Sequence, residues 1–96
     1  MTYYINKTNG DLLVSISDGT KNTSSTSITL IGKNAVDFGE SQNENFVKLL
    51  EHFANETAPL HPLKGQLWYD LVIKKIKLYD GTLWRPISGT TVDSIP

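Results

Sequence analysis

The segment from about residue 41 to residue 55 constrains the fold of this chain most, because it predicts one amphipathic helix. Ser41 and Glu44 have the spacing of a capping box, in which two side chains satisfy exposed amides at a helix N-terminus. Behind them, apolar residues recur at helical spacing and share one side of the helix: Phe46, Leu49, Leu50 and Phe53. Because Pro59 cannot continue a helix, we expect this one to end near Asn55.

Short runs with strand character precede the helix. Apolar and β-branched residues alternate with polar ones there, and turn-forming clusters separate the runs. A run of Thr, Ser, Asn and Lys at 20–26 is predicted to be a flexible surface loop, because such side chains bond to nearby backbone. The predicted N-terminal strands are 3–5, 12–17 and 27–31.

A three-stranded antiparallel meander is predicted at about 66–87, after the helix. Asp80 and Gly81 suit a two-residue hairpin loop, which would pair Tyr79 with Thr82. In that register one face carries Ile76, Leu78, Leu83 and Arg85. The opposite face carries Lys75, Lys77, Tyr79 and Trp84. The fold class expected from the sequence is therefore α+β.

Length and charge limit the classes of function. With 96 residues the chain has room for one small domain, which we place at 1–87, followed by a flexible tail or linker at 88–96. A net charge of -1 does not favour binding to nucleic acid. The chain has no cysteine, its N-terminus lacks the pattern of a secretion signal, and no segment is long and apolar enough for a membrane span.

Titratable side chains give no positive indication of catalysis or of a metal or cofactor site. His52 and His61 have no carboxylate or serine at a spacing that forms a relay. Asp70 and Asp80 end strands or begin turns, where aspartate commonly bonds to its own backbone. We therefore expect no enzyme activity and no cofactor.

The aromatic residues of the meander allow two interpretations. Trp68, Tyr79 and Trp84 are rimmed by polar residues, as in sugar-binding sites, and are the candidate glycan contacts. Small β modules also need such residues for cross-strand packing, because each aromatic side chain buries a large area. Packing is the preferred interpretation, and glycan binding is the alternative.

Several short motifs occur in a fixed order between about residue 28 and residue 87. They are Leu30-Ile31-Gly32-Lys33-Asn34, Gly39-Glu40, Gln42-Asn43-Glu44-Asn45-Phe46, Leu49-Leu50-Glu51, Phe53-Ala54-Asn55, Pro62-Leu63, Gly65-Gln66-Leu67-Trp68-Tyr69-Asp70 and Leu78-Tyr79-Asp80-Gly81-Thr82-Leu83-Trp84. Together they resemble a structural module of tailed-bacteriophage tail fibre and baseplate proteins. The resemblance implies a non-catalytic virion component of the tail, made in the host cytoplasm. It also implies attachment to other tail or baseplate proteins and assembly of several copies, with a trimer possible.

One segment departs from this pattern. Where such modules carry polar turn residues, this chain has three consecutive apolar residues, Leu71, Val72 and Ile73. Either they are buried under the helix or they form an exposed patch, which puts the tight turn in doubt and favours a protein contact. We therefore expect a docking module of a phage tail with Leu71, Val72 and Ile73 as candidate contacts.

Overall fold

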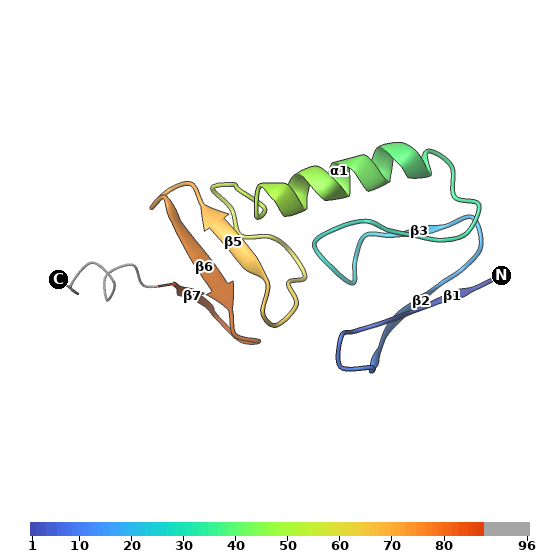
Figure 1. Cartoon of the computed structure of the whole chain (residues 1–96), viewed down its shortest axis with the longest axis horizontal. Helices are drawn as coiled ribbons and strands as arrows, with labels where there is room; N and C mark the ends of the chain where they lie inside the picture. The colour runs from blue at the N-terminus through green and yellow to red at the C-terminus, as the bar shows by residue number, and fades with distance from the viewer. Residues whose placement is uncertain (88–96) are drawn as a thin grey trace. The chain divides into compact units, whose positions relative to one another are not determined.

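A computed structural model describes residues 1–87, and the predicted tail at 88–96 lies outside the described residues. Within this range the chain forms one helix and several short antiparallel strands in three small sheets (Figure 1). This confirms the predicted α+β class. The chain divides into two compact units, Met1–Leu50 and Glu51–Pro96, and each is described by itself. A single domain at 1–87, and packing of the helix on the meander, stay predictions.

The first unit begins with the first two predicted strands, which form a hairpin. Strands β1 (Tyr3–Asn6) and β2 (Leu12–Ile16) pair antiparallel, with Ile5 opposite Val14. The amide of Lys7 donates to the carbonyl of Asp11 at 2.8 Å, and Gly10 supplies the left-handed backbone (φ 97°) that closes the turn. Ile16, at the end of β2, is one of the few buried apolar residues of this unit.

The polar run at 20–26 is not simply a surface loop, because part of it forms a strand and Thr26 is buried, so this prediction was wrong. Part of the run forms β3 (Lys21–Asn22), which pairs with β4 (Leu30–Ile31). The side chain of Asn22 accepts the amides of Ser24 and Ser25, and Thr26 is buried and bonds to Ile28. Backbone amides that composition alone would leave hydrogen-bonded to water are thus bonded to side chains. Of the predicted strand at 27–31, only the last two residues form one.

Helix α1 (Phe38–Leu50) is present, but both of its predicted ends were wrong. Its first turn begins earlier, because the carbonyl of Asp37 accepts the amide of Ser41 at 3.1 Å. Ser41 is therefore inside the helix and does not cap it. At the other end, His52 and Phe53 adopt left-handed backbone angles (φ 50° and 55°), which stops the helix before Asn55.

A buried amide anchors α1 to the rest of the first unit. Asn45 is only 8% exposed, and its side chain pairs with both backbone groups of Thr29. Its Nδ2 donates to the Thr29 carbonyl at 2.6 Å, and its Oδ1 accepts the Thr29 amide at 2.9 Å. The apolar residues that define the predicted stripe, in contrast, are exposed on α1: Phe46, Leu49 and Leu50.

The second unit contains the predicted meander. Strands β5 (Leu67–Asp70), β6 (Lys75–Tyr79) and β7 (Trp84–Pro86) form an antiparallel sheet in the order β5-β6-β7. In Figure 1 these are the yellow to orange-brown arrows. Pro86 lies on the edge strand, as expected for a residue without an amide to donate. Beside β5 runs the segment 52–55, which is held by hydrogen bonds between His52 and Tyr69 and between Asn55 and Leu71.

The predicted register between β6 and β7 was wrong by two residues. Tyr79 pairs with Trp84, not with Thr82, so the loop contains four residues. The reason is the side chain of Asp80, whose Oδ1 accepts the amides of Thr82 and Leu83, each at 2.8 Å. Since a shift of two residues preserves the alternation of faces, Trp84 still lies on the predicted face, whereas Leu83 is in the loop.

Candidate functional site

The three candidate glycan contacts lie together on one face of the meander. Trp68 and Trp84 pack edge to face with ring centroids 5.4 Å apart, and Tyr79 and Trp84 pack at 5.1 Å. Aromatic rings stabilise each other at centroid separations of about 4.5–7 Å, and both pairs lie in this range. Tyr79 and Trp84 face each other across β6 and β7, and Trp68 extends the cluster from β5.

Trp68 is mainly a packing residue. It is 5% exposed, and its indole Nε1 donates to the carbonyl of Asn55 at 3.3 Å. Little of its ring surface is therefore open to a sugar. Trp84 and Tyr79 are half-buried and retain some exposed surface, so the glycan alternative depends on these two rings.

An ion pair between half-buried Lys77 and buried Asp70 lies beside the aromatic cluster. The Nζ atom of Lys77 lies 4.9 Å from the centroid of the Trp68 ring and 2.9 Å from Oδ2 of Asp70. The hydrogen bond from Lys77 is the largest cause that lowers the pKa of Asp70, and the amides of Val72 and Ile73 lower it further. Both charges are thus engaged in holding the sheet and its turn.

The candidate protein contacts form the turn between β5 and β6. The Asp70 carbonyl accepts the amide of Lys74 at 2.7 Å, and the Asp70 carboxylate accepts the amide of Val72 at 2.9 Å. The tight turn, which the sequence had put in doubt, is therefore present. Leu71, Val72 and Ile73 are all exposed, Val72 by 68%, and they form an apolar surface on a well-bonded turn.

Asp80, the other aspartate considered in the sequence, also has a structural role. Hydrogen bonds from the Leu83 amide, then from Arg85 and the Thr82 amide, hold the pKa of Asp80 far below its ordinary value. Asp80 thus fixes the β6–β7 loop. Among residues 1–87, no group of three or more His, Asp or Glu side chains is arranged to hold a metal ion. The helix in this range is too short and too polar to cross a membrane.

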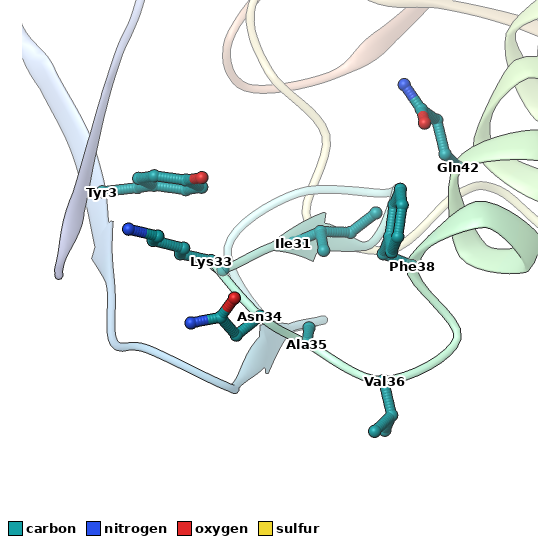
Figure 2. A pocket seen from close by; sticks show the side chains of 9 residues that line it. Tyr3, Ile31, Lys33, Asn34, Ala35, Val36, Phe38 and Gln42 are labelled. Carbon is teal, nitrogen blue, oxygen red and sulfur yellow. The ribbon is translucent and has the colours of Figure 1, made fainter.

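The first unit contains a concave surface that the sequence did not reveal. It is an open hollow of about 570 Å³ beside β4 and the start of α1, which we call the β4–α1 hollow. Figure 2 shows the rings of Tyr3 and Phe38 on either side of Ile31, with Gln42 projecting from α1. Its lining comes from three separate segments, so no local motif marks it. The lining residues are Tyr3, Ile31, Gly32, Lys33, Asn34, Ala35, Val36, Phe38 and Gln42.

Comparison with protein-family models, with curated proteins and with solved structures gives no match for this chain. The resemblance to phage tail modules therefore depends on the sequence motifs alone.

Proposed function

We propose that this chain is a non-catalytic virion structural protein, a docking module of a phage tail fibre or baseplate component. The observation that carries the proposal is the apolar turn at Leu71, Val72 and Ile73. Hydrogen bonds to Asp70 hold its backbone, and all three side chains are exposed to solvent. Exposed apolar patches of this kind are typical of protein interaction sites.

The small buried core supports the same proposal. Among residues 1–87, the buried hydrophobic residues are only Ile16, Ala35 and Trp68, while many large apolar side chains are exposed. A small chain that buries so little apolar surface by itself gains stability when neighbours cover the remainder. Attachment to other tail proteins, or to further copies, would provide such neighbours.

The position of the chain in an intact particle tests this function. Cryo-electron microscopy of the virion, with the chain located by its density or by a fused tag, is expected to show it against another tail or baseplate protein. A position at the free distal end, in contact with no tail protein, would overturn the proposal.

Glycan binding at Trp84 and Tyr79 is the competing hypothesis, since these rings keep some exposed surface. Under the docking proposal, the chain binds no host glycan on an array. Specific glycan binding that Trp84→Ala abolishes, with the fold retained, would favour a receptor-binding module. Leu83→Ala is the matched control, because Leu83 is the exposed neighbour of Trp84 and lies outside the aromatic cluster.

A further inference from the structure

The chemistry of the β4–α1 hollow indicates what it can bind. Tyr3, Phe38 and Ile31 supply apolar surface, while Lys33 supplies a positive charge near the Tyr3 ring (Figure 2). None of the lining residues is a carboxylate. The hollow therefore suits an apolar side chain that stands next to a negatively charged group.

The carboxyl end of α1 has this chemistry. Leu50, the last helical residue, is 80% exposed, which is the largest value among the exposed apolar side chains of residues 1–87. The next residue, Glu51, is exposed and acidic. The carbonyl groups of the last helical turn add partial negative charge. One short segment thus presents an apolar side chain and an anion together.

We infer that the β4–α1 hollow of one copy receives Leu50 of a second copy, with Lys33 paired to Glu51 of that second copy. The hollow is roomy enough for an aliphatic side chain, since about 570 Å³ lies in the range of pockets that bind small organic groups. Because the hollow and the end of α1 are different surfaces, the contact is head-to-tail. It closes into a ring or continues as a filament, depending on the rotation between copies.

This inference rests on the proposed docking function and names one partner, a further copy of the chain. The partner is the second copy because charge complementarity between Lys33 and Glu51 accompanies the apolar match, and both surfaces belong to the same molecule. Rim charges of this kind act strongly at low ionic strength and are screened by salt. The association is therefore expected to weaken as salt is raised.

Sedimentation velocity of the purified full chain over a concentration series tests the apolar half of the contact. The wild-type chain is expected to self-associate, and Leu50→Asp is expected to weaken the association about 10- to 100-fold, the effect of losing one buried aliphatic side chain. Leu60→Asp is the matched control, because Leu60 is similarly exposed but lies outside α1. A monomer at every concentration up to the solubility limit, or equal effects of the two substitutions, would overturn the inference.

A charge exchange tests the polar half. Lys33→Glu and Glu51→Lys are each expected to weaken self-association several-fold, because each places like charges together. Combining the two substitutions in one chain restores opposite charges at every head-to-tail contact, in a ring of any size or in a filament, so association should return. Absence of this recovery, with all three variants folded by circular dichroism, would contradict the pairing. A chain that is monomeric in solution yet occupies a tail position in particles overturns only this inference and leaves the docking function standing.

Discussion

Replacing Asn45 by aspartate tests the hydrogen bonding that anchors α1. The two side chains have nearly the same shape, so packing is little changed. The Oδ1 atom that accepts the Thr29 amide is kept, but the Nδ2 donor that lies 2.6 Å from the Thr29 carbonyl is replaced by a carboxylate oxygen. At pH 7 a buried donor–acceptor pair becomes a pair of facing acceptors.

The size of the effect follows from the two ways in which the variant can respond. Leaving the Thr29 carbonyl without its partner costs about 1–3 kcal/mol, and repulsion by the carboxylate adds to this. Protonating the carboxyl instead restores a donor but costs about 4 kcal/mol at pH 7, because its ordinary pKa is about three units lower. We therefore expect Asn45→Asp to lower the free energy of unfolding by about 2–4 kcal/mol at pH 7.

The same reasoning predicts the pH dependence. The introduced carboxyl has a higher pKa in the folded chain than in the unfolded chain, so the folded state binds more protons in between. The defect is therefore largest at neutral pH and shrinks as pH falls toward about 4, where the carboxyl is protonated and donates to Thr29. Native Asp70 and Asp80 have lowered pKa values, so they make the free energy of unfolding fall as pH falls. This contribution is common to all variants and cancels when Asn45→Asp is compared with a control variant.

Urea unfolding followed by circular dichroism at 222 nm measures this effect, because α1 is the helix of residues 1–87 and dominates the signal. Circular dichroism is chosen over tryptophan fluorescence because both tryptophans lie in the second unit, away from α1. Asn43→Asp is the matched control, with the same change in charge at an exposed position of α1. Equal stabilities of the two variants, or a difference that does not change with pH, would refute the proposed anchoring.

Four further predictions concern the fold and its acid stability. Gly32→Ala should destabilise the first unit by about 1–3 kcal/mol in urea unfolding, because the added Cβ would lie 2.7 Å from the carbonyl oxygen of Thr20. Trp68→Ala should cost the second unit about 3–5 kcal/mol by the same method. Since Asp70 and Asp80 have lowered pKa values, they stabilise the folded state above about pH 4 and this contribution is lost at lower pH, so Asp80→Asn should flatten acid unfolding curves. If residues 1–87 form one domain, unfolding by tryptophan fluorescence and by circular dichroism should coincide, and separate transitions would contradict that prediction.

Local patterns predicted the elements of the fold better than their ends. The meander strands followed from alternating residues bounded by turns, and the structure confirms them. The ends of α1 depend on interactions that a capping pattern does not contain. The carbonyl of Asp37 accepts the first helical hydrogen bond, so the helix begins upstream of Ser41. Near the other end, the carbonyl of His52 bonds to β5, although the apolar spacing predicts that residues 51–55 are helical. At the C-terminal end of α1, tertiary hydrogen bonds to β5 outweigh local preference.

The β6–β7 register shows the same limit on a smaller scale. Asp80 and Gly81 alone favour a two-residue loop, but the Asp80 carboxylate has two amides and Arg85 within reach and stabilises a longer one. In the polar run at 20–26, the side chains of Asn22 and Thr26 bond to nearby backbone groups in a specific arrangement that composition alone does not indicate.

The candidate site was predictable in part. The structure brings Trp68, Tyr79 and Trp84 together, and of these the shared face of Tyr79 and Trp84 was predicted. The exposure of Leu71 to Ile73 was one of the two outcomes considered. The β4–α1 hollow was not predictable, because residues far apart in the sequence line it and only the folded first unit assembles them.

Accessibility of the apolar turn in the assembled particle tests the docking function most directly. The chain has no cysteine, so Val72→Cys introduces a single thiol at a position that is 68% exposed in the isolated chain. Thr8→Cys, in the exposed β1–β2 loop, is the matched control. Both thiols should react rapidly with a maleimide in the isolated chain, whereas in particles only the Val72→Cys thiol should be protected. Equal labelling of the two positions in intact particles would contradict docking through this turn.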